Sequence, residues 1–206
     1  MKRTHAVIAC VPLMLILAGC SEDQKPAAVE NKAPEKPAEA VTAQTAFHQM
    51  FIAARGWAGD VKLLRLGDLE VKDVKGSPGK SGAWEAVFVS ERTMRSRRYT
   101  YSVVKTPDME KGASGSHDES WSGPAQTTPI ALAEFKIDSV AAYEEALKKG
   151  ADYAKKHPDL PIKVVLEHTK RFQNPAWRVI WGESVTKSDY SIYIDATEGG
   201  YLQTAR

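Results

Sequence analysis

The chain has 206 residues, and its 28 Lys and Arg against 26 Asp and Glu give a formal net charge of +2 at pH 7. Lys2 and Arg3 account for this excess, so the rest of the chain is neutral. A neutral balance provides no electrostatic footprint for nucleic acid, and we therefore expect no nucleic-acid partner.

The N-terminus follows the pattern of an export signal. A short basic segment precedes an apolar run over residues 6–17, which is shorter than the roughly 20 residues of a membrane-spanning helix. The run ends in a segment that resembles the bacterial lipobox, in which a signal peptidase cuts before a Cys whose thiol carries a diacylglycerol: Leu17, Ala18, Gly19 and Cys20. We predict a lipoprotein signal peptide over residues 1–19 and lipidation of Cys20. The alternative is an ordinary secretory signal with an incidental Cys.

Cysteine usage agrees with export. Cys10 would leave with the signal peptide, so the mature chain would hold only Cys20 and could form no intramolecular disulfide. Two acyl chains on one residue would anchor the protein stably in a membrane. Lipoproteins retained in the inner membrane often carry Asp after the lipidated Cys, whereas this chain carries Ser21. The resemblance therefore implies the outer membrane, with the chain facing the periplasm.

Residues 20–41 have the composition of a tether. They are rich in Ala, Pro, Glu and Lys and contain no aromatic residue. Such a segment buries too little apolar surface to offset the entropy of ordering it, so we predict a disordered linker.

Two amphipathic helices are predicted, far apart in the chain. Over residues 42–58 the apolar residues at helical spacing are Ala46, Phe47, Met50, Phe51, Ala54, Trp57 and Ala58. Over residues 139–156 the same spacing is kept by Val140, Tyr143, Leu147, Gly150 and Ala154. Asp138 is a natural N-cap for the second helix, and Pro158 is its stop signal.

Each predicted helix is followed by segments that alternate as strands do. After the first helix these are residues 60–71, 83–91 and 97–105; after the second they are residues 161–169, 176–184 and 189–196, with a short strand from residue 200. We predict a polar, Gly- and Ser-rich loop over residues 106–129 and a strand over residues 130–137 that closes the first sheet.

The chain thus contains one pattern twice. Ala83-Trp84 matches Ala176-Trp177, and the strand at Tyr99 matches the strand at Tyr190. We predict two units, a degenerate first one over residues 42–137 and a second over residues 138–206. Antiparallel strands with a helix on one face define the fold class as α+β.

The second unit has a Trp-x-Val segment (Trp177-Arg178-Val179), a Tyr-rich strand over residues 190–194 and a closing Asp-Ala-x-x-Gly segment from Asp195 to Gly199. In these features it resembles the PepSY family. The resemblance implies a PepSY/cystatin-like helix on an antiparallel sheet, and peptidase binding or inhibition rather than catalysis. Asp195 and Gly199 suit a tight turn, because Asp accepts backbone N–H groups and Gly tolerates positive φ.

We find no constellation that predicts an enzyme. His48, His117, His157 and His168 have no second His at ligand spacing, so we expect no metal and no cofactor. Ser114, His117 and Asp118 are neighbours in a predicted loop, whereas the members of a catalytic triad are brought together by the fold.

A basic cluster is predicted at the tip of the hairpin after residue 91, formed by Arg92, Arg95, Arg97 and Arg98. It could contact anionic lipid headgroups or an acidic partner. The alternative is that it only keeps an edge solvated and unpaired.

The preferred hypothesis is a non-catalytic, membrane-anchored binding module for an envelope protein, with a peptidase as the candidate partner and strand addition at a sheet edge as the binding mode. The alternative is a carrier of a small apolar ligand or lipid in the periplasm. Its site would be lined by Trp57, Trp84, Trp177 and Trp181, which could equally be core residues.

Overall fold

The computed structural model of the chain describes residues 37–206. The predicted signal peptide, the lipobox with Leu17, Ala18, Gly19 and Cys20, and most of the predicted linker lie outside the described residues. The linker was predicted to end at residue 41, but Val41 already belongs to the fold because it pairs with Ser81.

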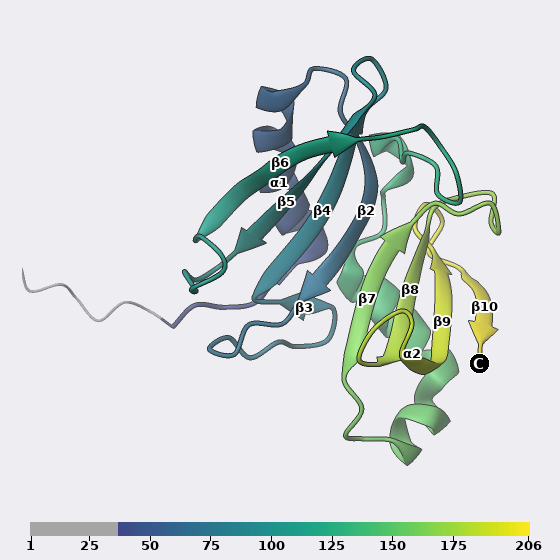
Figure 1. The fold of residues 1–206 in the computed structure, drawn as a ribbon. Coiled ribbons are helices and arrows are strands. Elements are labelled where there is room, and N and C mark those ends of the chain that lie inside the picture. Colours follow the sequence, from purple (N-terminus) through teal and green to yellow (C-terminus); the bar gives the residue numbers. More distant parts are fainter. Residues whose placement is uncertain (1–36) are drawn as a thin grey trace, which may run out of the picture. The chain divides into compact units, whose positions relative to one another are not determined.

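One antiparallel sheet of eight strands forms the body of the protein (Figure 1). Its order is β10-β9-β8-β7-β2-β4-β5-β6. In chain order the strands are β2 (Lys62–Leu69), β4 (Ala83–Ser90), β5 (Arg95–Ser102), β6 (Gly112–Ser120), β7 (Ile162–Glu167), β8 (Ala176–Gly182), β9 (Ser188–Asp195) and β10 (Tyr201–Ala205). Two short strands, β1 (Val41–Thr42) and β3 (Lys80–Ser81), form a separate pair.

The sequence predicted a separate sheet for each half of the chain, and this is wrong. β2 of the first half pairs with β7 of the second half, with Leu66 opposite Leu166, so the strands of both halves join into one sheet. Leu66 and Leu166 are fully buried, and beside them Arg65 Nε lies 2.9 Å from Glu167 Oε1. We call the junction of β2 and β7 the seam.

Helices α1 (Ala43–Trp57) and α2 (Ser139–Lys156) cover one face of the sheet (Figure 1). α1 packs on the strands of the first half and α2 on β8 and β9. The buried face of α1 carries Phe47 and Met50, and the ring of Phe47 lies 5.9 Å from that of Phe88 on β4. Gly150 of α2 lets the helix approach Trp181 closely, since a Cβ at this position would lie 2.9 Å from the indole.

A buried Trp fixes each helix to the sheet. Trp84 Nε1 donates to the carbonyl of Val41 at 3.0 Å, and Trp177 Nε1 donates to the carbonyl of Ile137 at 2.8 Å. Val41 and Ile137 directly precede the N-caps Thr42 and Asp138. Each indole therefore holds the first turn of a helix against the second residue of a strand.

The strand pairing corrects one predicted match between the halves. Ala86 pairs with Tyr99 on β5, and Val179 pairs with Ile192 on β9. Counted from the first residues of β4 and β8, Tyr99 therefore lies at the same pairing position as Ile192, and Tyr190 lies at another.

The loop predicted over residues 106–129 is partly wrong, because Gly112–Ser120 forms β6, an edge of the sheet. Gly and Ser have low strand propensity, but cross-strand partners on β5 override it. The hydroxyls of Ser114 and Thr100 lie 3.0 Å apart, and Arg97 donates to Asp118 at 3.0 Å.

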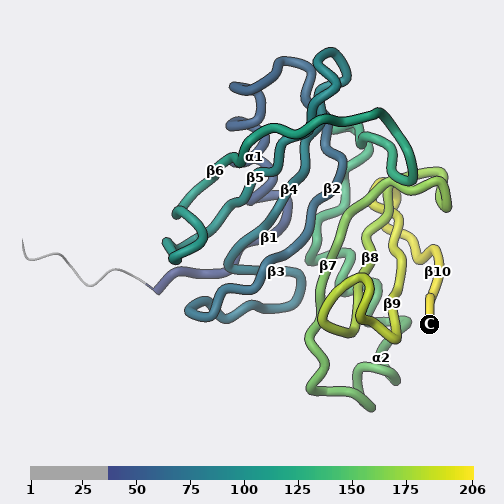
Figure 2. The backbone as a smooth tube through the Cα atoms, viewed as in Figure 1, coloured from purple at the N-terminus to yellow at the C-terminus, as the bar shows by residue number. Residues whose placement is uncertain are grey.

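The strand predicted over residues 130–137 is also wrong. Only Ile130 bridges to Leu63, and a 3-10 turn, η1 (Leu132–Glu134), follows. The segment belongs to a crossing connection, which Figure 2 traces from β6 to α2, and of its apolar residues Ile130 and Phe135 are buried in the core whereas Leu132 is exposed. The ring of Phe135 lies edge-on to Phe47 at 5.3 Å and to Trp177 at 5.8 Å, so it joins the cores of the two halves.

Candidate functional site

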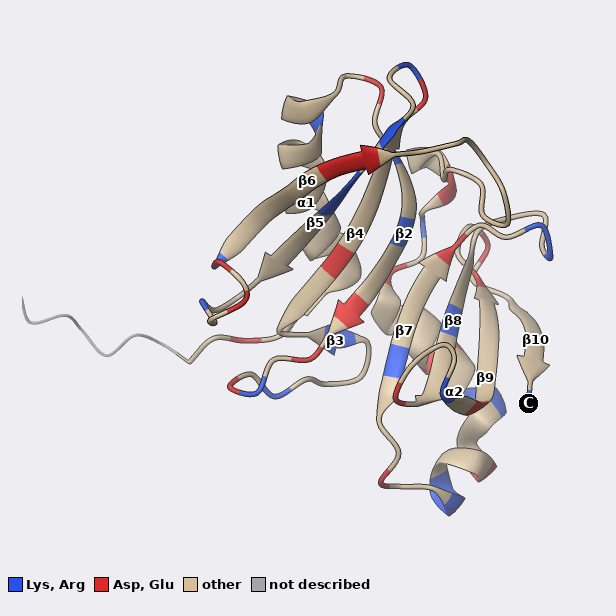
Figure 3. Cartoon of the chain, viewed as in Figure 1, with Lys and Arg blue, Asp and Glu red and all other residues tan. Residues whose placement is uncertain are grey.

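The four predicted arginines do not form one surface cluster. Arg92 lies in the turn between β4 and β5, whereas the other three lie on β5 itself. Arg95 and Arg97 both pair with Asp118 on β6, at 3.2 and 3.0 Å, and Arg98 pairs with Glu85 on β4. Figure 3 shows the basic stretch of β5 beside the acidic end of β6.

These ion pairs are reflected in the protonation of Asp118. The hydrogen bond from Arg97 is the main cause that lowers the pKa of the Asp118 carboxyl, and it raises the pKa of the guanidinium. Three of the four predicted anion-binding groups thus already have a carboxylate partner within the fold.

Asp195 is the last residue of β9, and Gly199 lies in the turn that leads to β10. Asp195 Oδ1 accepts the backbone N–H groups of Thr197 at 2.8 Å and Glu198 at 2.9 Å. Gly199 has φ +80, and its N–H donates to the carbonyl of Asp195. The backbone of this turn also holds the start of α2, because Ala196 O accepts from Ile137 N at 2.9 Å. Both residues therefore have the geometry of turn-forming residues.

The tryptophans differ in their surroundings. Trp84, Trp177 and Trp181 are buried in the core between the helices and the sheet. Trp57 is partly buried, with the guanidinium of Arg97 5.1 Å from its ring centroid. Of the three buried indoles, that of Trp181 has no hydrogen-bond partner in the described chain. Trp84 also borders an open cavity, which lies at the seam.

The outer strands β6 and β10 are the edges of the sheet. β10 has only five residues, and such short edges resist the addition of another strand. β6 has nine residues and also shifts its register against β5 after Gly115, but its first half, Gly112 to Ser116, contains no charged residue and no Pro. The first half of β6 is therefore the more accessible edge for an additional strand.

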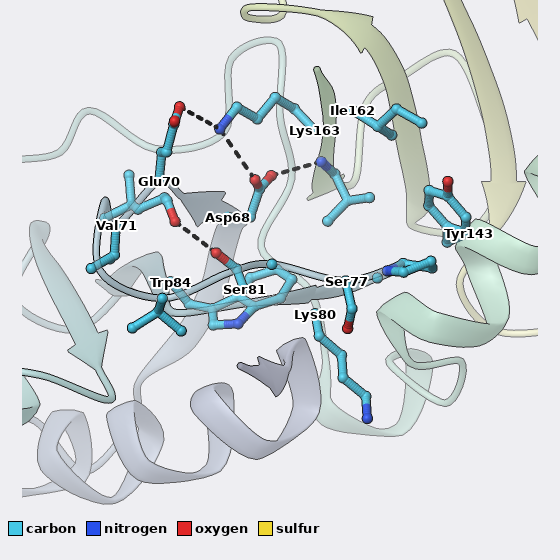
Figure 4. Close-up of a pocket in the computed structure, with 16 residues that line it drawn as sticks. Asp68, Glu70, Val71, Ser77, Lys80, Ser81, Trp84, Tyr143, Ile162 and Lys163 are labelled. Atoms are coloured by element: carbon cyan, nitrogen blue, oxygen red, sulfur yellow. Dashed lines mark hydrogen bonds and ion pairs between the residues drawn. The ribbon is translucent and has the colours of Figure 1, made fainter. Parts of the chain in front are cut away.

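A cavity of about 320 Å³ opens where β2 and β7 diverge (Figure 4). The strands pair over three residues on each side, and beyond Gly67 they separate. The end of β2, the loop into β3, the start of β7 and α2 line the space. We call it the seam cavity, and its main lining residues are Asp68, Glu70, Trp84, Tyr143, Ile162 and Lys163.

Asp68 is a carboxylate on the helix-covered side of the sheet. It pairs with the buried Trp84 and follows the buried Leu66 by two residues, so it occupies a position that apolar side chains hold elsewhere on this face. Its Oδ1 accepts the N–H of Val164 at 2.7 Å. If the pairing of β2 with β7 continued to this position, a backbone carbonyl of β2 would accept this N–H instead. Burial raises the pKa of Asp68, and the Val164 hydrogen bond and the charge of Lys163 partly oppose this.

The ammonium of Lys163 lies between two carboxylates at the mouth of the seam cavity (Figure 4). Its Nζ is 3.5 Å from Asp68 Oδ2 and 3.8 Å from Glu70 Oε2. Hydrogen bonds between ammonium and carboxylate groups are normally about 2.7–2.9 Å long. Lys163 is thus attracted to both carboxylates, but at distances longer than an ordinary charged hydrogen bond to either.

The N-termini of the two helices meet at Asp138 and Ser139. Asp138 Oδ1 accepts from Ser139 N at 2.7 Å and from Gln44 N of α1 at 3.0 Å. Ser139 Oγ accepts from Ala43 N and donates to the carbonyl of Gly79, in the loop that borders the seam cavity. The sequence predicted Asp138 as a cap of α2 but not its role at α1.

Sequence reasoning also missed Asp68 and Lys163. The available signal was an acidic residue on the apolar side of a predicted strand, in the segment Leu66-Gly67-Asp68-Leu69. Lys163 shows no such anomaly in the sequence, since its closeness to Asp68 depends on the pairing of β2 with β7.

Within residues 37–206, no group of three or more His, Cys, Asp or Glu side chains is arranged to hold a metal ion. None of the helices in this part of the chain is long and apolar enough to cross a membrane. Comparisons with protein-family models, with curated proteins and with solved structures find no match to this chain.

Proposed function

We propose that this chain is a non-catalytic binding module of the cell envelope, anchored through a lipid on Cys20 and facing the periplasm from the outer membrane. Its partner would be an envelope protein, with a peptidase as the first candidate because of the PepSY resemblance. The observation that carries the proposal is the free edge of β6. An extended segment of the partner would add to this edge by main-chain hydrogen bonds.

We also propose that the two halves, residues 42–137 and 138–206, are copies of one PepSY-like helix-and-sheet unit. The equivalent hydrogen bonds of Trp84 and Trp177 support this. The start of β5 also follows the start of β4 by the same number of residues as the start of β9 follows the start of β8. The free edge of β6 occupies in the first half the place that β10 occupies in the second.

The β6 edge is suited to this role by its side chains. Ala113, Ser114 and Gly115 are small, so a partner strand could approach the backbone without steric hindrance. Gly115 is also required by the fold, because a Cβ there would lie 2.8 Å from the ring of Tyr99. Such an edge offers backbone groups and little side-chain selectivity, so selectivity would come from neighbouring surfaces.

A photo-crosslinking experiment in cells tests the proposal. A photoreactive residue replaces Ser116 of β6 or, as the control, Tyr201 of β10, in the full chain and in the Cys20→Ala variant. We expect an adduct with an envelope protein from position 116 that requires Cys20 and is absent from position 201. Equal adducts from the two edges, or none from position 116, would contradict docking at β6.

Proline substitutions sharpen this test. In an edge strand, adjacent residues direct their N–H groups alternately toward the sheet and away from it. Of Ala113→Pro and Ser114→Pro, one therefore removes an outward donor and the other an inward donor. The outward variant should keep its unfolding free energy within about 1 kcal/mol and lose the adduct. An adduct that survives in that variant would refute strand addition.

The alternative function, a carrier of a small apolar ligand, is favoured by the seam cavity. Its volume of about 320 Å³ is at the lower end of the range for ligand pockets. Val71, Val74 and Ile162 supply apolar walls. Extraction of the natively purified chain followed by mass spectrometry tests this function, and a stoichiometric apolar compound would support it.

A further inference from the structure

We propose that the seam cavity is a binding site for a primary ammonium group carried on a short apolar stem. The inference concerns the cavity at the β2–β7 seam and does not depend on docking at β6. It rests on the two carboxylates at the cavity, on the position of Lys163 between them, and on the apolar wall beneath.

The first step is the incomplete coordination of Asp68. Its Oδ1 accepts the Val164 N–H, and within residues 37–206 the cation beside its Oδ2 is the ammonium of Lys163, at 3.5 Å. The side chain of Asp68 is 12% exposed, so water compensates little of its charge. A cation that reached Oδ2 at hydrogen-bond distance would stabilise this carboxylate more than Lys163 does.

The second step is that Lys163 already occupies the position of such a cation. Its ammonium lies between Asp68 and Glu70 and is closer than 3.5 Å to neither. The chain therefore places a cation here in a loose arrangement. A ligand ammonium could displace that of Lys163, which could then move into solvent on its flexible stem.

The third step concerns the stem of the ligand. Beside the carboxylates, the cavity is also bordered by Trp84, Ile162 and Tyr143, which offer apolar and aromatic surface (Figure 4). An aliphatic stem would remove part of this surface from water. Aromatic rings also attract cations. The lysine side chain of a peptide and a free alkylamine both have this chemistry.

Titration of the full chain with n-butylammonium tests the proposal, with the amide resonance of Val164 as the reporter because this N–H donates to Asp68. Sodium butyrate and n-butanol at matched ionic strength are the controls for charge and stem. We expect a saturable shift of the Val164 resonance at millimolar n-butylammonium only. Saturation by butyrate, equal shifts with butanol, or no saturable shift with any probe would overturn the proposal.

Two substitutions give opposite results for a cation site and an anion site. Asp68→Asn retains an acceptor for Val164 N–H but removes the charge, and it should weaken n-butylammonium binding at least tenfold. Lys163→Met removes the intramolecular competitor and should strengthen it several-fold. If Lys163→Met instead abolished binding, the site would be one for anions and the proposal would fail.

Folding controls and a second ligand complete the experiment. Glu70 is 81% exposed, so Glu70→Gln should leave the fold intact while weakening binding two- to fivefold, which provides a test even if Asp68→Asn does not fold. An unchanged affinity in this variant would remove Glu70 from the site and contradict a two-carboxylate arrangement. An acetylated and amidated Gly-Lys-Gly peptide then distinguishes the sources: tighter binding than n-butylammonium identifies a peptide lysine, and weaker binding a free amine.

Discussion

Substitution of Asp138 by Ala tests whether one carboxylate stabilises the N-termini of both helices. Its Oδ1 accepts from Ser139 N at 2.7 Å and from Gln44 N at 3.0 Å, and both contacts are partly buried. Loss of an N-cap acceptor costs about 0.5–2 kcal/mol per helix, and an unsatisfied buried donor about 1–3 kcal/mol. We expect Asp138→Ala to lower the free energy of unfolding by about 2–3 kcal/mol, which is more than one ordinary cap contributes.

Urea unfolding followed by far-ultraviolet circular dichroism measures this loss. Asp138→Asn keeps an oxygen acceptor and should stay within about 1 kcal/mol of the parent. Asp152→Ala changes an exposed Asp on the same helix and should alter stability by no more than about 0.5 kcal/mol. If Asp138→Ala lost less than about 1 kcal/mol, or if the Asn variant lost as much as the Ala variant, the double cap would be refuted.

Three further predictions concern the seam and the helix contacts. Burial raises the pKa of the Asp68 carboxyl above its unfolded value of 3.8, so the folded state binds this proton more tightly than the unfolded state. As the pH falls from above the folded pKa toward 3.8, the parent should therefore gain stability relative to Asp68→Asn. A constant difference in urea midpoint between the two proteins across this pH window would contradict the raised pKa. Gly79 has φ +68, and a Cβ there would lie 2.5 Å from the backbone of α2. Gly79→Ala should therefore lower the free energy of unfolding by about 2–4 kcal/mol or prevent folding. As the control, a Cβ at Gly59 would meet no atom within 4 Å, so Gly59→Ala should stay within about 1 kcal/mol of the parent in the same measurement. Gly150→Ala should be destabilising although Ala is the better helix former by about 1 kcal/mol, because the new Cβ would lie 2.9 Å from Trp181. In a double-mutant cycle, Gly150→Ala should cost less stability in the Trp181→Phe background than in the parent. Additive losses would exclude the contact with Trp181 as the cause.

Helices and most strands follow from periodicity because their signals are local. Helix α1 was predicted over residues 42–58 and spans Ala43–Trp57, and α2 spans Ser139–Lys156 as predicted. In both cases the apolar spacing and a capping residue agree with the packing, so local preference and tertiary context point the same way.

Segments whose structure depends on distant partners were predicted less well. Gly112–Ser120 forms a strand because β5 offers cross-strand partners, and its own composition indicates a loop. Residues 130–137 have strand-like composition, but they form a connection in which Phe135 packs between Phe47 of one half and Trp177 of the other. In these places the tertiary structure overrides propensity.

The seam cavity was beyond sequence reasoning for a related reason. Asp68 and Lys163 are brought together only because β2 pairs with β7, and neither turn chemistry nor periodicity specifies the pairing between strands that lie far apart in the chain. The acidic residue on the apolar face of β2 was the one local anomaly that marked the place.

The shared cap at Asp138 and Ser139 also has a consequence for how the chain folds. These residues follow their α1 partners by 94 and 96 positions, so during N-to-C synthesis the first turn of α1 lacks these acceptors until more than half of the chain has been made. A fragment that ended before residue 138 would leave the backbone donors of Ala43 and Gln44 without them. The first turn of α1 therefore gains these two hydrogen bonds only after the start of α2 has been synthesised.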